Sequence, residues 1–277
     1  MLKRDGHTHT EFCPHGSGDD VELMIQKAIQ LGFKSYSITE HAPLPPAFSD
    51  RYAGQVTGLT EASMAMNDLA AYFKKANLMK KKYADQIEIK IGFEVDFLAD
   101  DVAWTREFLN EYGPQTDDNI LSVHFMKGKD EKYWCVDDTP GDFQLGLLSE
   151  TPDAQMLFAK YFNLIKQAVL SDLGPYAPNR IGHITLIRKF QDHFQLDPNY
   201  NLRNQKLLES LLELIKDRGK QLDFNAAGLY KPDCNQPYPN FKLAEKAKQM
   251  GIPLVYGSDA HGVADIGRGY HGLAEFL

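Results

Sequence analysis

The first residues of the chain concentrate side chains that bind metal ions. His7 and His9 are two positions apart, so on an extended segment they point to the same face. His15 follows in a Pro/Gly turn that can fold back over that face. Neutral imidazoles gathered in this way are ligands for transition metals. The whole chain of 277 residues has only nine histidines, so this clustering indicates a metal site that needs further ligands.

Further candidate ligands lie close to predicted β-strands. Short apolar or alternating segments predict strands at residues 2–9, 34–39, 87–94, 119–124, 180–184, 221–226 and 253–256. One histidine lies within a predicted strand, and the other candidates stand at or just after strand ends. Together they are His41, Glu94, His124, His183, Asp259 and His261.

Predicted helices alternate with these strands, which is typical of parallel βαβ units and an α/β fold. The strand count favours one domain over residues 1–277, a TIM-like barrel slightly short of the usual eight strands. Residues 127–150 are irregular and are expected to form an insertion loop. The carboxyl ends of barrel strands converge on one face, so residues between positions 7 and 261 would meet in one site.

Nine nitrogen and oxygen ligands are too many for one ion. We therefore expect two or three divalent metal ions, with Glu94 able to bridge a pair. Paired metals activate a water and stabilise both the attacking and the leaving oxygen of a phosphoryl transfer. Imidazole and carboxylate together suit Zn, Mn or Fe and do not choose among them.

Charge and cysteine content restrict the class of protein. The net charge of −8 argues against a nucleic acid or an anionic membrane surface as the main partner, but it permits a pocket for a small anion. Cys13, Cys135 and Cys234 are too widely spaced for a disulfide framework, and we expect Cys13 to be a packed small residue. The start of the chain lacks a signal-peptide pattern, and no apolar segment approaches the roughly 20 residues of a membrane helix. These features predict a cytoplasmic enzyme, and they leave its oligomeric state open.

The order and type of the candidate ligands resemble the motif set of the PHP (polymerase and histidinol phosphatase) family. This resemblance implies a distorted (β/α)7 barrel with a trinuclear metal centre. One ion would be held by His7, His9, Glu94 and Asp259; a second by Glu94, His124 and His183; and a third by His15, His41 and His261.

Within that family the chain is most similar to the histidinol-phosphate phosphatase branch. The segments that carry the likeness are Cys13-Pro-His15-Gly16, Gly182-His183-Ile184 and Asn225-Ala-Ala-Gly228. The likeness implies hydrolysis of L-histidinol phosphate to L-histidinol and phosphate, in histidine biosynthesis. One departure is Thr185, where the family often has an aspartate.

A small phosphorylated substrate needs cations beyond the metals. Arg188 is the first candidate for a phosphate contact, followed by Lys231 and Arg268. Asn225, at a strand end, is expected to line the site. Asp259 or His261 is the candidate proton donor to the leaving oxygen.

Three alternatives to this function are considered. The chain could be a phosphoesterase for another small ester on the same barrel. It could be an amidohydrolase-like enzyme that cleaves a C–N bond, although no lysine stands at the matching strand ends. It could also be a metal-storage or regulatory module without turnover.

Overall fold

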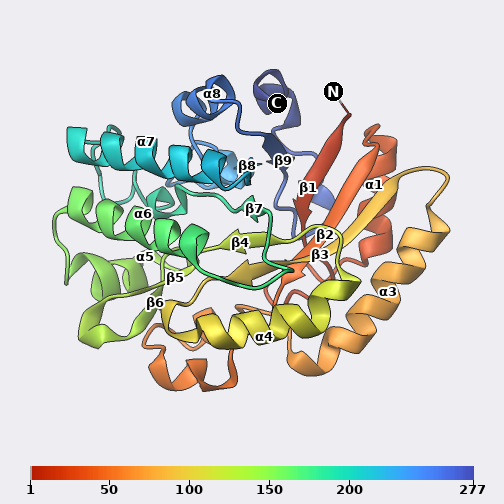
Figure 1. Ribbon diagram of the computed structural model, residues 1–277, viewed down its shortest axis with the longest axis horizontal. Helices are drawn as coiled ribbons and strands as arrows, with labels where there is room; N and C mark the ends of the chain where they lie inside the picture. The colour runs from red at the N-terminus through yellow and green to blue at the C-terminus, as the bar shows by residue number, and fades with distance from the viewer. Residues whose placement is uncertain (1) are drawn as a thin grey trace.

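A computed structural model describes residues 2–277 of the chain. Its main feature is a seven-stranded parallel sheet whose strands follow the order β1-β2-β3-β4-β7-β8-β9 (Figure 1). The strands are β1 (Arg4–Thr8), β2 (Ser35–His41), β3 (Glu88–Asp96), β4 (Ile120–Ser122), β7 (Arg180–Ile181), β8 (Gln221–Asn225) and β9 (Leu254–Gly257).

The first and last strands meet, so the sheet is nearly closed. Thr8 and Ala260 form a parallel bridge. The backbone N–H of Asp259 donates to the carbonyl of His7 (2.8 Å), and that of His9 donates to the carbonyl of Ala260 (2.9 Å). The predicted distorted seven-stranded barrel is therefore confirmed.

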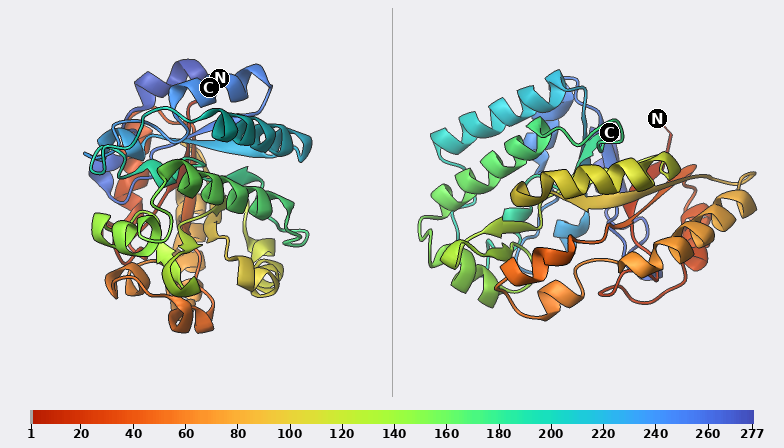
Figure 2. Two further views of the ribbon diagram at one scale, coloured as in Figure 1. Left: turned by 90° about the vertical axis from the view of Figure 1, so that its left-hand side faces the viewer. Right: turned by 60° about the horizontal axis from the view of Figure 1, so that its bottom comes forward.

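Helices surround this barrel on its outer side (Figures 1 and 2). They are α1 (Val21–Gln30), α2 (Thr57–Thr60), α3 (Leu69–Lys82), α4 (Val102–Tyr112), α5 (Pro140–Asp142), α6 (Ala154–Leu170), α7 (Leu202–Asp217), α8 (Phe241–Gln249) and α9 (Tyr270–Leu273). Within residues 2–277, no helix combines the length and the apolar character needed to cross a membrane.

Helix α1 shows how the sequence sets these elements. The side chain of Asp20 accepts a hydrogen bond from the backbone N–H of Glu22, which caps the helix start. Met24 and Ile25 belong to an apolar face that is buried against the sheet core. Gly32 adopts a φ of +80° just beyond the helix end, a conformation that glycine tolerates best.

The interior of the barrel is charged at the end where the strands begin. The Asp118 carboxylate accepts hydrogen bonds from Arg180 Nη2 (2.8 Å), from Ser37 Oγ (2.7 Å) and from Arg4. Arg180 is fully buried there. Gly6 makes room for it, because a Cβ at position 6 would lie 2.2 Å from Arg180 Nη1. The ion cluster of Arg4, Asp118 and Arg180 thus fills the barrel opposite the carboxyl ends of the strands.

The prediction of an irregular insertion loop at residues 127–150 is corrected, because much of this segment is regular structure. Strands β5 (Phe125–Lys127) and β6 (Tyr133–Cys135) pair as an antiparallel hairpin. Helix α5 and a π-helical segment at Phe143–Leu148 follow. Phe125 and Tyr133 pack with Phe48 in a small separate core. The strands are too short for a clear periodicity, so tertiary packing decides their structure.

Two other boundaries differ from expectation. The sequence predicts a long helix over residues 60–83, but helix α3 begins only at Leu69, after the short helix α2 and an irregular segment. Strand β7 ends at Ile181, so His183 follows the strand instead of lying within it. His183 thereby joins the other candidate ligands at the carboxyl end of the barrel.

Candidate metal centre

Glu94 lies at the centre of the site, near the end of β3. Its Oε2 atom is 3.1 Å from His7 Nε2 and 3.3 Å from His41 Nδ1. Its Oε1 atom is 2.7 Å from His183 Nε2 and 3.5 Å from His124 Nε2. The two carboxylate oxygens therefore face two different groups of imidazoles. This is the arrangement that a bridging carboxylate requires.

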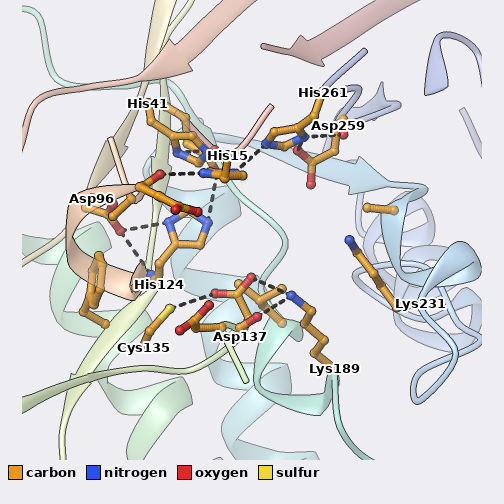
Figure 3. A pocket seen from close by; sticks show the side chains of 18 of the residues that line it. His15, His41, Asp96, His124, Cys135, Asp137, Lys189, Lys231, Asp259 and His261 are labelled. Carbon is orange, nitrogen blue, oxygen red and sulfur yellow. Dashed lines mark hydrogen bonds and ion pairs between the residues drawn. The ribbon is translucent and has the colours of Figure 1, made fainter. Parts of the chain in front are cut away.

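The other eight candidate ligands gather around this carboxylate. Figure 3 labels His15, His41, His124, Asp259 and His261 of this set. In each of three groups the possible ligand atoms lie within 4.8 Å of one another. His15 joins through its Nε2 atom, which is 2.9 Å from His261 Nε2. The three groups are His7, His9 and Asp259; Glu94, His124 and His183; and His9, Cys13, His41 and His261.

Several imidazole nitrogens in the site are buried without a hydrogen-bond partner in the described part of the chain. They are Nε2 of His7, both ring nitrogens of His41, and Nδ1 of His183. A buried polar group left unpaired costs about 1–3 kcal/mol, so such nitrogens are rare unless they serve a ligand. The donor set therefore fits divalent metal ions.

Three further carboxylates hold the imidazoles in place. Asp223 Oδ2 lies 2.8 Å from His7 Nδ1, Glu40 Oε1 lies 3.1 Å from His9 Nδ1, and Asp96 Oδ1 lies 2.9 Å from His124 Nδ1. Such contacts fix the ring orientation of metal-binding histidines and raise their basicity. Sequence reasoning gave these carboxylates no role. The available signal was an acidic residue inside each otherwise buried strand.

The charges of the carboxylate ligands suit cations. Burial alone would raise the pKa of Glu94, but the imidazoles of His7, His124 and His41 bring it well below its ordinary value. Burial opposes ionisation of Asp259 too, and its histidine neighbours again bring the pKa well below the ordinary range. Both carboxylates are therefore anionic at neutral pH.

Four of the imidazoles fall into two pairs that differ in the direction of their pKa shift. Burial lowers the pKa of His41 and His261 well below the ordinary value, with neighbouring histidines adding to the effect, so both stay neutral. Burial would also lower the pKa of His9 and His124, but adjacent carboxylates raise it to about 9 and about 10. Protons therefore compete with metal ions at His9 and His124.

A cavity of about 310 Å³ opens over these residues. Lys189, Lys231 and Arg268 are the basic residues in its wall. Figure 3 shows the Lys231 ammonium pointing into the cavity, whereas Lys189 Nζ lies 3.3 Å from Asp137 Oδ2. Burial lowers the pKa of Lys231, as do the charges of Lys189 and Arg268. The cavity therefore offers a cation beside the candidate metal centre.

Comparison with known proteins identifies the family. The family model of the PHP domain matches residues 5–227, and that of a PHP-associated region matches residues 237–276. The chain belongs to the PHP family. A histidinol-phosphatase of Bacillus subtilis is 40% identical to this PHP chain over 275 residues, which cover 99% of each chain.

Solved structures also resemble this PHP protein. A Listeria monocytogenes protein, provisionally named a histidinol phosphatase, is 49% identical and has a TM-score of 0.96, covering 98% of this chain and 99% of that chain. A histidinol phosphate phosphatase of Lactococcus lactis, solved with zinc, L-histidinol and phosphate, is 19% identical. Its TM-score is 0.70 over 99% of this chain and 94% of that chain, which supports the shared fold.

The predicted phosphate contact of Arg188 is corrected by its position in the structure. Its Nε donates to Gln191 Oε1 (2.6 Å), and its Nη2 donates to the carbonyl of Asp197 (3.0 Å). The guanidinium also packs on the rings of Phe158 and Tyr200. Arg188 is buried among these groups and is absent from the cavity wall, so it is not placed to bind phosphate. Its sequence neighbour Lys189 reaches the cavity instead.

Arg268 and Asn225, both predicted to contact substrate, form hydrogen bonds to the Ser258–Asp259 segment instead. Arg268 lines the cavity, but its Nε and Nη2 donate to the carbonyls of Ser258 (2.8 Å) and Asp259 (2.7 Å). Asn225 is fully buried, outside the cavity wall, and its Nδ2 donates to Asp259 Oδ2 (3.1 Å). Both side chains therefore position Asp259, whose φ of +52° is strained for a residue with a side chain.

The two candidate proton donors, Asp259 and His261, lie among the candidate metal ligands. The low pKa of Asp259 leaves it without a proton to give, and the low pKa of His261 leaves its imidazole neutral. Both groups have the protonation state of a metal ligand. Their role as proton donors to the leaving oxygen stays a prediction.

Proposed function

We propose that this PHP protein is a metal-dependent phosphomonoesterase that hydrolyses L-histidinol phosphate to L-histidinol and phosphate. The observation that carries the proposal is the full-length likeness to the Bacillus subtilis histidinol-phosphatase. The candidate ligands support it, because Glu94 and the eight others gather beneath a cavity of suitable size. The full-length likeness favours phosphoryl transfer over the amidohydrolase and metal-storage alternatives.

Three groups of residues would hold metal ions. Asp259 completes one with His7 and His9, and Glu94 links that group to His124 and His183. The third group is formed around His41 and His261. When bound, two or three divalent ions would activate a water and stabilise charge on the phosphoryl oxygens. Zinc accompanies the Lactococcus lactis enzyme and suits this nitrogen and oxygen donor set.

Lys231 is the best phosphate contact that the chain itself supplies. Its ammonium points into the cavity and makes no hydrogen bond with the residues described. Lys189 stands in the same wall but is engaged by Asp137. Lys231 would therefore bind a phosphoryl oxygen directly, while Arg268 keeps the Asp259 segment in place.

The acidic character of the cavity favours a substrate that also carries a cation. Glu61 and Asp138 line the wall, and Asp138 Oδ2 is buried without a hydrogen-bond partner in the described chain. Burial raises the pKa of Asp138, and the nearby charges of Asp142 and Asp137 add to this effect. A cationic ligand group would relieve that repulsion. L-Histidinol phosphate has an ammonium group, and simple sugar phosphates lack one.

Phosphate release from the purified, zinc- or manganese-loaded protein tests the proposal. L-Histidinol phosphate is expected to exceed glycerol 3-phosphate and glucose 6-phosphate by about 100-fold in kcat/KM, as expected for about 2.7 kcal/mol of transition-state binding. The Asp138→Asn variant should narrow this difference. Equal, slow release from all three esters would instead favour a phosphoesterase for another substrate.

A further inference from the structure

The third group of candidate ligands includes a sulfur atom. The Sγ atom of Cys13 lies within 4.8 Å of ligand atoms of His9, His41 and His261. His9 also belongs to the group of His7 and Asp259, where its Nε2 atom lies 3.1 Å from Asp259 Oδ1. The groups left to share an ion with the sulfur are therefore His41 and His261.

His41 independently indicates a ligand at this place. It is 6% exposed, and neither of its ring nitrogens makes a hydrogen bond with the described residues. Its Nδ1 faces Glu94 Oε2 at 3.3 Å. The Nε2 atom of the same ring is buried without a hydrogen-bond partner among the described residues, and a His41 ring nitrogen belongs to the Cys13 group.

The turn after β1 separates Cys13 from His15. The N–H of Cys13 donates to the carbonyl of Thr10 (3.1 Å), and the N–H of Gly16 donates to the carbonyl of Cys13 (3.1 Å). Cys13 is 4% exposed and absent from the cavity wall, whereas His15 lines the cavity. His15 Nε2 is 2.9 Å from His261 Nε2. Sulfur thus approaches from the protein interior, and His15 approaches from the cavity side.

We propose that Cys13 is a ligand of the third metal ion, together with His15, His41 and His261. The inference rests on the proposed metal centre and extends it to a three-nitrogen, one-sulfur donor set. As the metal–sulfur bond forms, the thiol proton passes to solvent, and no oxidation or reduction is involved. Thiolate is a soft ligand, so this position would prefer zinc or cobalt to manganese.

Cobalt substitution tests the assignment without relying on turnover. The metal-free full-length protein is loaded with Co²⁺, and its near-ultraviolet spectrum is recorded together with the bound cobalt content. The wild-type protein should show a thiolate-to-cobalt charge-transfer band. Cys13→Ser and Cys13→Ala should both lose the band, with circular dichroism unchanged.

Two cysteine variants serve as matched controls. Cys234 is buried, and its Sγ donates to the carbonyl of Gln236 (3.6 Å). Cys135 lines the cavity, and its Sγ donates to Asp137 Oδ1 (3.3 Å). Cys234→Ser and Cys135→Ser should keep the band. If either removes it, or if a Cys13 variant retains it, the assignment of Cys13 is wrong.

A second measurement uses the wild-type protein, so it does not depend on correct folding of the variants. Labelling of Cys13 in the wild-type protein by a thiol reagent, located by mass spectrometry, should be slowed by zinc loading at least as strongly as labelling of Cys135. A wild-type protein that binds cobalt without the band, and in which zinc leaves Cys13 labelling unchanged, would overturn the proposal. Phosphatase activity is measured separately, so an inactive protein with the band would refute only the proposed function.

Discussion

At the scale of single residues, Glu94 is the group on which the site depends most. Its two oxygens face separate sets of imidazoles, and its side chain is buried. Replacing its charge would leave those imidazoles without their shared anion. The loss should therefore affect more than one metal position.

The Glu94→Gln variant is expected to bind at least one metal ion fewer and to lose more than about 1,000-fold in kcat, since both paired-metal roles fail together. Elemental analysis and phosphate release check this result. Glu88→Gln is the matched control, because Glu88 is exposed at the start of the same strand, β3. Full metal content and normal turnover in Glu94→Gln would contradict the bridging role.

The position of Lys231 leads to a prediction about how KM depends on pH. Because burial lowers its pKa, its ammonium form is lost at a lower pH than in an ordinary lysine. The KM for substrate should therefore rise as the pH increases through that lowered value. Lys231→Arg should delay the rise to higher pH, because arginine stays charged.

Removing the charge completes the test of Lys231. Lys231→Met should raise KM about tenfold or more at neutral pH, in line with a lost charge-assisted hydrogen bond of about 1.5–3 kcal/mol. Lys220→Met is the control, since Lys220 is partly buried too but donates to the carbonyl of Pro178. An unchanged KM in Lys231→Met would exclude the phosphate contact.

At the scale of elements, the segment after β9 is held by hydrogen bonds to its backbone and to the Asp259 side chain. Arg268 donates to the carbonyls of Ser258 and Asp259, and Asn225 donates to the Asp259 carboxylate. The strained backbone of Asp259 persists because these contacts fix it. The position of Asp259, a candidate metal ligand, thus depends on the side chains of Asn225 and Arg268.

The Arg268→Met variant should weaken metal binding and lower kcat about 10- to 100-fold, the usual effect of losing an outer contact to a metal ligand. Metal titration and kinetics check this, with Arg203→Met in helix α7 as a control. A pure phosphate contact would instead raise KM and leave metal affinity unchanged. That outcome would restore the original interpretation of Arg268.

At the scale of the whole molecule, the ion cluster of Arg4, Asp118 and Arg180 joins strands across the barrel. Burial would raise the pKa of Asp118, but the charges of Arg180 and Arg4 outweigh it and lower the pKa overall. The ionised carboxylate therefore stabilises the fold above its unfolded pKa of about 4. This contribution disappears as the pH falls through the lower, folded value.

The Asp118→Asn variant should lose about 3–5 kcal/mol of unfolding free energy at pH 7, because two arginines lose their buried partner. The difference from wild type should shrink below about pH 4, as Asp118 itself becomes protonated. Urea unfolding of the metal-free proteins measures both values. Asp172→Asn, which breaks an exposed pair with Arg106, should cost no more than about 1 kcal/mol. Equal losses at pH 7 and pH 3 would contradict the electrostatic explanation.

The amino-acid sequence by itself predicted the barrel and the residues that gather in its candidate metal centre. Strand and helix periodicity is local, and ligands such as His41 and Glu94 stand at strand ends, so their convergence follows from parallel topology. Position along a strand, however, does not give the direction of a side chain in a turn. Arg188 and Lys189 are adjacent, yet only Lys189 reaches the cavity.

Only the tertiary structure decided which groups support the ligands. Asp223 reaches His7 across 216 positions of the chain, and Glu40 reaches His9 across 31. The nearness of the Cys13 sulfur to His41 and His261 likewise depends on how the turn folds against the last strand. Such contacts join distant segments, and their geometry is set by packing of the whole barrel. A local pattern can mark an acidic residue inside a buried strand, but it does not show which histidine that residue reaches.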